Sequence, residues 1–245
     1  MRLIVYNIAY GTGSPGGESL RLVSGYRYLK TPEFFFAKIV HFLRHVRPDI
    51  VVLVETDLGS RRTGGKNQVE KLACHLQLDF LASAKYGTHS LLRRIPYMEY
   101  QANALLSNVP ITEPSCRYLP IGVKKLVLSG EISGISVFVI HLSLQRKTRA
   151  SQLQAIAEVL PKNKPTIVCG DFNTFAGTDE LLEFYQKTGL RNANRGENPT
   201  YPSWSPRSCL DHVLYSEHIQ VYHFEIPHVE YSDHLPIIID FNVLV

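Results

Sequence analysis

The sequence predicts an α/β fold in which two β-sheets pack against each other and helices cover their outer faces. Strand-like runs rich in Val, Ile, Phe and Tyr recur along the chain, bounded by Gly, Pro or Ser, and they outnumber the helical segments. Gly134 lies where a hairpin turn is expected, between residues 131 and 136. The predicted strands cover residues 2–8, 49–55, 79–82, 102–107, 125–132, 136–142, 166–170, 210–215, 219–227 and 235–243.

Helical segments separate these strands. Thr31 and Pro32 are typical of a helix start, because a capping side chain is followed by a proline at the first turn. The apolar face of this helix is predicted to include Phe35, Ile39, Phe42 and Val46. Residues 68–76 and 149–160 show similar periodicity, and a shorter helix is predicted to begin at Thr178.

Length and composition favour one domain over residues 1–245. The chain is long enough for a full core, and no Ser/Gly/Pro-rich or highly charged linker divides it. The formal charge of +4 is compatible with an anionic substrate but is far below that of a dedicated nucleic-acid binder. Four cysteines without CxxC spacing argue against a disulfide scaffold or structural zinc, and Cys169 lies in an apolar run, as a reduced core thiol would.

The N-terminal residues lack the long apolar region and the cleavage site of a signal peptide. No apolar stretch reaches the length needed to span a membrane. We therefore expect a soluble chain without a transmembrane segment, and a cytoplasmic location is slightly favoured unless a longer precursor exists.

Polar side chains recur where the apolar strands begin or end. A buried strand that ends in an ionisable residue places it at the rim of the core, where burial can shift its pKa. Taken singly, each residue has a simpler explanation as a solvated strand end, an Asx turn or a hydrogen-bonded buried amide. Their recurrence in one chain indicates a functional site, and the residues are Asn7, Glu55, His141, Asp171, Asn173, Asp211, Asp233 and His234.

This combination of side chains fits metal-assisted phosphoester hydrolysis best. A glycosidase needs only a carboxylate pair, and zinc sites prefer His or Cys at short spacing. Magnesium binds carboxylate or amide oxygens and completes its shell with water and phosphate, which makes Glu55 and Asn7 plausible ligands. Asp171 and Asn173, two residues apart, could orient a water and hydrogen-bond a phosphoryl oxygen. A His oriented by an Asp could stabilise the phosphate charge or protonate the leaving group.

Seven motifs in chain order resemble those of the endonuclease/exonuclease/phosphatase superfamily, which includes deoxyribonuclease I, apurinic endonucleases, neutral sphingomyelinases and inositol polyphosphate 5-phosphatases. They are VYNI at 5–8, DIVVLVE at 49–55, NALLS at 103–107, HLS at 141–143, GDFN at 170–173, LDHVL at 210–214 and SDH at 232–234. The resemblance covers essentially the whole chain, and GDFN combined with a C-terminal SDH is specific. It implies a four-layer α/β sandwich, with two mixed sheets face to face and helices outside.

The resemblance also implies a hard divalent metal, Mg²⁺ in the first place, with Mn²⁺ or Ca²⁺ as alternatives. Asn7 and Glu55 would bind the metal, and Asp233 would support that side of the site. Asn103 lies in a motif where many members place a substrate-contacting amide. His141 matches a second histidine of the deoxyribonuclease I and sphingomyelinase branches; apurinic endonucleases generally lack it, which argues against a role at abasic sites.

The remaining roles follow from the same resemblance. Asp171 would orient or activate the attacking water, and Asn173 would contact the scissile phosphate. Asp211 would position His234, which would contact the phosphate. The leading expectation is a phosphodiesterase acting on nucleic acid or on a lipid headgroup, with no readable protein partner. A phosphomonoesterase of the inositol-phosphatase type and a non-catalytic binding module are the alternatives.

Three segments bear on the substrate. The Gly-rich residues 11–28 form a predicted loop that could cradle phosphate through its amides or could simply be flexible. Residues 86–100 combine apolar side chains with paired arginines, which favours a buried segment with solvated Arg tips over one that contacts lipid. Trp204 could lie near the site. Two basic groups could line an anionic cleft or be ordinary surface, namely Arg61, Arg62 and Lys66, and Arg146, Lys147 and Arg149.

Overall fold

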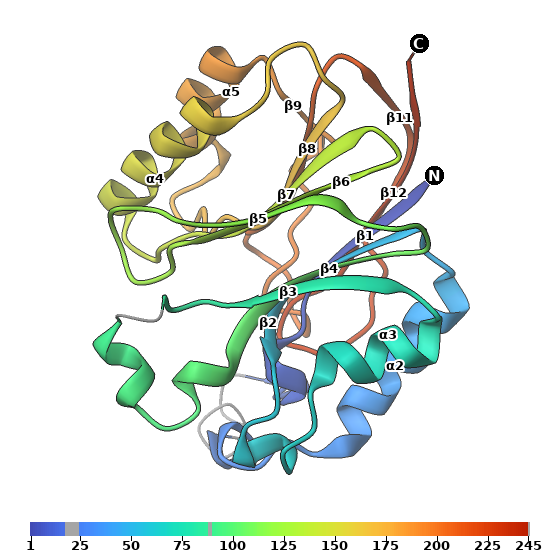
Figure 1. The fold of residues 1–245 in the computed structure, drawn as a ribbon, viewed down its shortest axis with the longest axis vertical. Helices are drawn as coiled ribbons and strands as arrows, with labels where there is room; N and C mark the ends of the chain where they lie inside the picture. The colour runs from blue at the N-terminus through green and yellow to red at the C-terminus, as the bar shows by residue number, and fades with distance from the viewer. Residues whose placement is uncertain (18–24, 88–89, 245) are drawn as a thin grey trace.

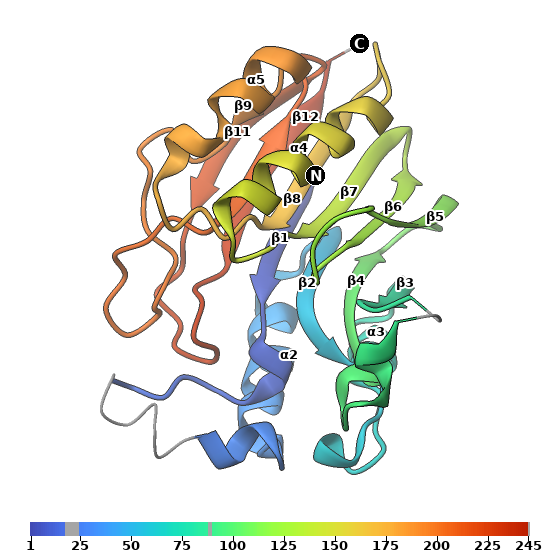
Figure 2. The same cartoon turned by 90° about the vertical axis from the view of Figure 1, so that its left-hand side faces the viewer.

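The computed structural model describes residues 1–17, 25–87 and 90–244. Two six-stranded sheets pack face to face, with helices on their outer faces (Figures 1 and 2). This confirms the predicted α/β sandwich. No helix in the described ranges is long and apolar enough to cross a membrane.

The first sheet contains one parallel strand pair, β1–β2, and is otherwise antiparallel. Its order is β11 (Ile219–Glu225), β12 (Ile237–Val243), β1 (Arg2–Asn7), β2 (Ile50–Asp57), β4 (Gln101–Ser107) and β3 (Asp79–Ala84). The second sheet has the parallel pair β7–β8. Its order is β5 (Thr112–Tyr118), β6 (Leu126–Ile132), β7 (Ile135–His141), β8 (Thr166–Asp171), β10 (Asp211–Tyr215) and β9 (Arg191–Asn192).

The central strands are buried on both faces, which is why they read as nearly continuous apolar runs. In β1, Leu3 and Val5 point into the core between the sheets, whereas Ile4 and Tyr6 pack under the helices of the first sheet. The same alternation in β7 and β8 fills the core and the outer layer of the second sheet.

Helices α2 (Glu33–Val46) and α3 (Gln68–Leu76) cover the first sheet, and α4 (Arg146–Val159) and α5 (Leu182–Thr188) cover the second (Figure 1). Helix α3 has the predicted bounds, α4 begins three residues before its predicted start, and the short 3₁₀ helix η6 (Thr178–Leu181) leads into α5.

The predicted apolar face of α2 is partly wrong. Its fully buried residues are Phe36, Ile39, Val40 and Leu43, and of the other predicted residues Phe42 and Val46 are partly buried and pack against the same core. Phe35 instead packs beside Gly13 and under the Arg27 guanidinium, on the loop that follows β1. Successive aromatic residues at 34–36 left the phase of the helix ambiguous.

The sequence does not predict two of the strands, β5 and β9. Strand β5 is exposed at every position and contains Pro114, so it has no apolar alternation. Strand β9 has only two residues. The predicted hairpin is confirmed, because β6 and β7 pair through a turn in which Ser133 and Gly134 both have positive φ.

Two predicted segments lie partly outside the described residues. Within 86–100, residues 88–89 are not described. Leu91 begins the 3₁₀ helix η4 (Leu91–Arg94), Ile95 follows it, and both side chains are exposed. The expectation of a buried segment is therefore wrong for these two residues. Within the loop at 11–28, residues 18–24 are not described. Its described residues Gly11, Thr12, Gly13 and Ser14 are buried, and η2 covers Gly25–Tyr28.

Candidate active site

Strand register brings the predicted residues to one edge of the sandwich. His141 lies opposite Asp171 in the parallel β7–β8 pair, and Asp211 lies opposite Asp171 in the antiparallel β8–β10 pair. Asn7 pairs with the residue before Glu55 across β1 and β2. The two sheets contact each other through β1, β2, β7 and β8, so these strand ends meet (Figure 2).

Asp171 lies at the centre of the cluster. Its Oδ1 accepts a hydrogen bond from the backbone N–H of Asn173 at 2.9 Å, and its Oδ2 accepts one from Asn7 Nδ2 at 3.1 Å. His141 Nε2 lies 3.3 Å from the same Oδ2. Burial raises the pKa of Asp171 to about 6, despite the opposing charge of His234. Asp171 is therefore an anion at neutral pH, yet a stronger base than an ordinary aspartate.

Gly170 allows Asp171 to take this position. Its φ is +137°, and a Cβ on residue 170 would lie 2.0 Å from the backbone oxygen of Ile140. Only glycine permits the neighbouring strand to approach this closely.

Asp211 and His234 form a buried pair. Asp211 Oδ2 accepts hydrogen bonds from His234 Nδ1 and from Thr200 Oγ1, both at 2.7 Å. Burial opposes a charge on the His234 ring, but Asp211, Asp171 and Asp233 together outweigh it and raise the pKa to about 10. His234 is therefore an imidazolium at neutral pH, with Nδ1 held by Asp211 and Nε2 left to act as a donor.

Glu55 is presented by a strained backbone. Its φ is +59°, at a break in the pairing of β2 with β4 between Leu53 and Thr56. Its Oε1 lies 3.3 Å from Lys85 Nζ and 3.9 Å from His141 Nε2. Burial favours the neutral acid, but the charges of Lys85, Lys124 and His234 prevail and lower the pKa of Glu55.

Two lysines flank this carboxylate. Lys85 Nζ donates to Tyr10 Oη at 3.0 Å as well as to Glu55, and burial lowers the pKa of Lys85 to about 8, against the stabilising charge of Glu55. Lys124 Nζ donates to His141 Nε2. Burial, together with the charges of Lys124, Lys85 and His234, lowers the pKa of His141 well below its ordinary value, so this ring is neutral.

The other predicted residues have distinct environments. The Asn173 side chain donates to the backbone oxygen of Leu142 at 2.8 Å, so it ties the loop after β8 to the end of β7. Asp233 Oδ1 accepts from Ser232 Oγ at 3.2 Å, and its charge contributes to the raised pKa of His234. Asn103 is buried, and neither amide atom has a hydrogen-bond partner among the described residues. An unpaired buried amide is costly and is typical of a group kept for a ligand.

Sequence reasoning missed Lys85, Lys124 and Thr200 as parts of this cluster. Lys85 follows β3 directly, so the strand-end pattern could have revealed it. Lys124 gives no sequence signal, since it reaches the cluster from the loop between β5 and β6. Thr200 lies four residues before Trp204, for which a position near the site is predicted.

Two of the basic residues that were predicted to line an anionic cleft or to lie on an ordinary surface are instead buried in ion pairs. Arg62 Nε lies 2.5 Å from Asp57, and Arg149 Nη2 lies 2.6 Å from Glu180. Each guanidinium group is therefore occupied by a buried carboxylate inside the protein and does not line a cleft.

The donor set fits a hard divalent cation. One ligand atom each from Asp171, Asp211 and His234 lies within 4.8 Å of the others, and all three residues are buried. Asp211 Oδ1 is buried without a hydrogen-bond partner in the described structure, so it can accept a ligand. Oxygen donors carry this fit, together with the nearby Glu55, because the protonated His234 ring offers no lone pair.

Solved structures share this fold at low sequence identity. The human Nocturnin catalytic domain with bound sulfate superposes with a TM-score of 0.73 and 19% identity, covering 99% of this chain and 94% of that one. A mannosyl-6-phosphatase from Bacteroides thetaiotaomicron gives 0.74 and 16%, with 99% of each chain covered. An endonuclease/exonuclease/phosphatase from Beutenbergia cavernae gives 0.74 and 18%, covering 100% of this chain and 72% of that one.

Sequence comparison identifies the family. A relative from Escherichia coli K12, described as the uncharacterized protein YbhP, is 30% identical over 172 residues, which cover 61% of this chain and 67% of that protein. The sequence model of the Endonuclease/Exonuclease/phosphatase family matches residues 6–234. That span contains every residue of the cluster from Asn7 to His234, and the chain therefore belongs to the endonuclease/exonuclease/phosphatase family.

Proposed function

We propose that this protein is a divalent-metal-dependent phosphodiesterase that hydrolyses its substrate by direct attack of water. The observation that carries the proposal is the contrast between two neighbouring buried groups. Asp171 is a carboxylate whose pKa is raised to about 6, and His234 is an imidazolium whose pKa is raised to about 10. Groups with opposed protonation in one site are what general base and general acid catalysis require.

In this proposal Asp171 accepts a proton from the attacking water. The backbone N–H of Asn173 and the Asn7 amide fix its two oxygens, so the carboxylate cannot rotate away. His234 donates from Nε2 to a phosphoryl or leaving oxygen, while Asp211 holds Nδ1 and keeps the ring charged. The unpaired Asn103 amide supplies a further contact to the substrate.

Asn7, Glu55 and Asp233 are the proposed residues on the metal side, together with the unpaired Asp211 Oδ1 on which the fit of a cation rests. Mg²⁺ is the proposed ion, with Mn²⁺ or Ca²⁺ as substitutes. When bound, such a cation polarises a phosphoryl oxygen and lowers the pKa of a bound water. Glu55 suits this role because the lowered pKa keeps it ionised.

Hydrolysis of bis(4-nitrophenyl) phosphate and of 4-nitrophenyl phosphate, each with Mg²⁺, Mn²⁺ or Ca²⁺, tests the proposal. We expect metal-dependent turnover of the diester and its loss in Asp171→Ala and His234→Ala. Preferential turnover of the monoester would support the phosphomonoesterase alternative. No turnover with any metal, or activity that survives both substitutions, would favour a non-catalytic binding module on this fold.

A further inference from the structure

Three short segments at one edge of the molecule combine exposed aliphatic side chains with a pair of basic residues. They are residues 91–95 (LLRRI), 121–125 (IGVKK) and 144–147 (LQRK), here called the three edge segments. None of them contains an acidic residue. Their exposed aliphatic side chains are Leu91 at 72%, Ile95 at 45%, Ile121 at 49%, Val123 at 55% and Leu144 at 63%.

Two of the three edge segments, 121–125 and 144–147, lie beside the catalytic cluster. Lys124, in the second segment, contacts His141, and the third segment begins three residues after His141. Buried Gln152 on α4 holds these two segments together, because its Nε2 donates to the backbone oxygens of Ile121 and Lys124 and its Oε1 accepts from the N–H of Ser143. These loops are therefore fixed parts of the site's surroundings.

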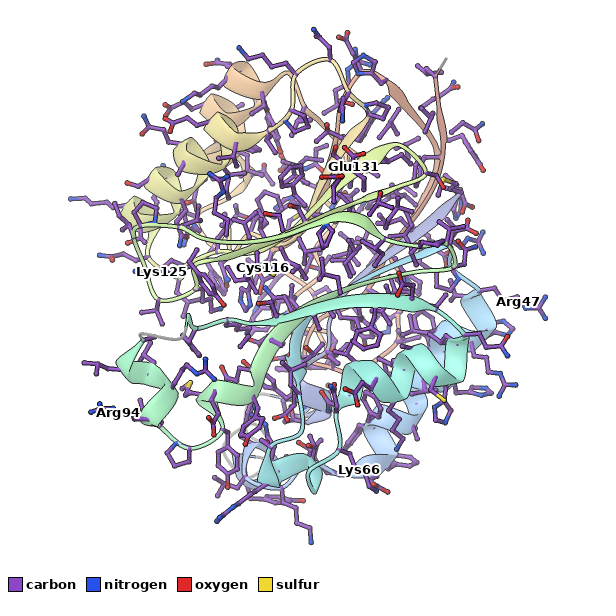
Figure 3. All side chains as sticks on the ribbon, in the orientation of Figure 1. Arg47, Lys66, Arg94, Cys116, Lys125 and Glu131 are labelled. Carbon is purple, nitrogen blue, oxygen red and sulfur yellow. The ribbon has the colours of Figure 1, made fainter. Side chains whose placement is uncertain are left out.

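The first segment lies on the same edge. Figure 3 shows Arg94 and Lys125 at this edge, with Arg47 at the opposite one. Figure 2 turns this edge toward the viewer, with the loop between β5 and β6 and the start of α4 in front. Exposed aliphatic and basic groups thus lie on the same edge as Lys124, which contacts His141 at the end of β7.

This chemistry favours a lipid layer over a nucleic acid. Proteins that bind single-stranded nucleic acid stack bases on aromatic side chains, and the exposed apolar residues of the edge segments are aliphatic. Aliphatic side chains can enter the boundary between headgroups and acyl chains, while neighbouring Lys and Arg contact anionic headgroups. Several such side chains exposed together mark an interaction surface on a folded protein.

We propose that the three edge segments form a docking surface for a lipid layer that contains anionic lipids. Docking would bring the catalytic cluster to the level of the headgroups. The substrate would then be a phosphoester of a lipid headgroup, a step that rests on the proposed function, whereas docking itself requires no turnover.

Co-sedimentation with phosphatidylcholine vesicles, with and without phosphatidylglycerol, tests the docking surface. We expect binding that is stronger with phosphatidylglycerol and weaker at high salt. The triple variant Leu91→Ser/Val123→Ser/Leu144→Ser and the double variant Arg146→Gln/Lys147→Gln should each weaken it about tenfold or more.

Two control variants at the opposite edge should bind as the wild type does. Leu244→Ser removes an exposed aliphatic side chain, and Arg44→Gln/Arg47→Gln removes two exposed basic residues at the end of α2. Thermal unfolding of every variant establishes that the fold is retained. The wild type's hydrolysis of a soluble aryl diester reports on the proposed function separately, so either conclusion can fail alone.

The proposal is overturned if the wild type does not sediment with anionic vesicles, or if the edge variants and the control variants bind equally. It is also overturned if single-stranded DNA binds more tightly than the vesicles and the edge substitutions weaken DNA binding, because the surface would then serve a nucleic acid.

Discussion

Replacing Asp211 by Asn tests whether one buried carboxylate keeps His234 charged. The substitution preserves size and removes the negative charge 2.7 Å from the His234 ring nitrogen. Thr200 can still hydrogen-bond the residue at 211. The substitution therefore changes the charge next to His234 while leaving the packing of the pair nearly unchanged.

The structure sets the size of the effect. A rise of the His234 pKa from 6.5 to about 10 corresponds to about 5 kcal/mol in favour of the charged ring. Burial, the largest single influence, acts in the opposite direction, and Asp211 contributes most to overcoming it. Without that carboxylate, we expect the pKa of His234 to fall below 7, so that the ring is neutral at pH 8.

Stability should report the same change. The raised pKa of His234 stabilises the folded state fully below pH 6.5, and this stabilisation is lost as pH rises through about 10. The excess stability of the wild type over Asp211→Asn should therefore shrink by a few kcal/mol between pH 6 and pH 10. Urea unfolding of both metal-free proteins at the two pH values measures it.

Histidine NMR titration and kinetics complete the assay. In Asp211→Asn, we expect His234 to titrate below pH 7 and kcat/KM for the aryl diester at pH 8 to fall about 10²- to 10³-fold, the usual cost of losing one charge-stabilising donor. If His234 titrates near 6.5 in both proteins, the ring is not held as an imidazolium and the proposed acid role is refuted.

Three further predictions concern single residues. Because the pKa of Asp171 is raised to about 6 and the base must be ionised, kcat/KM should fall about tenfold per pH unit below pH 6. Asp171→Asn should lower activity about 10²- to 10⁴-fold and abolish this acid-side decrease. A wild-type pH profile that stays flat down to pH 5 would contradict this. Asn103→Leu should lower kcat/KM without loss of thermal stability, since the amide has no hydrogen-bond partner among the described residues. A large drop in melting temperature would show that the amide has a structural role. Gly170→Ala should destabilise the fold by about 3 kcal/mol or more in urea unfolding, because the added Cβ would meet the Ile140 oxygen. Gly25→Ala, where no described residue lies within 4 Å of the added Cβ, should be nearly neutral. Equal stabilities would show that the close strand approach is not required.

The layered fold could be predicted from sequence because its central strands are buried on both faces and therefore carry continuous apolar runs. The same reasoning fails where burial is absent. Strand β5 pairs with β6 only, and every one of its residues is exposed, so no apolar alternation marks it in the sequence. Three consecutive phenylalanines at 34–36 satisfy two helix phases, and only the position of the loop beneath Phe35 decides between them.

The cluster could be predicted from sequence where a site residue ends a strand, as His141 and Asp171 do, or ends the apolar run of a strand, as Glu55 does in β2. Because β7 and β8 are parallel neighbours, their C-terminal residues lie side by side at the same edge of the sheet. Lys124 could not be found in this way, because a loop clamped by Gln152 brings it to His141. Protonation states also depend on three-dimensional burial: the same sequence signal marked both histidines, yet His234 is charged and His141 is neutral.

Whether hydrolysis requires a divalent cation held by Glu55 is the decisive question for the proposed chemistry. Protein stripped with EDTA is assayed with bis(4-nitrophenyl) phosphate while Mg²⁺ is added back, in the wild type, in Glu55→Gln and in the surface control Glu33→Gln. We predict no turnover before metal is added, saturable activation of the wild type and of Glu33→Gln, and a much higher Mg²⁺ requirement in Glu55→Gln. Full activity in EDTA, or the same Mg²⁺ dependence in all three proteins, would show that Glu55 holds no catalytic metal.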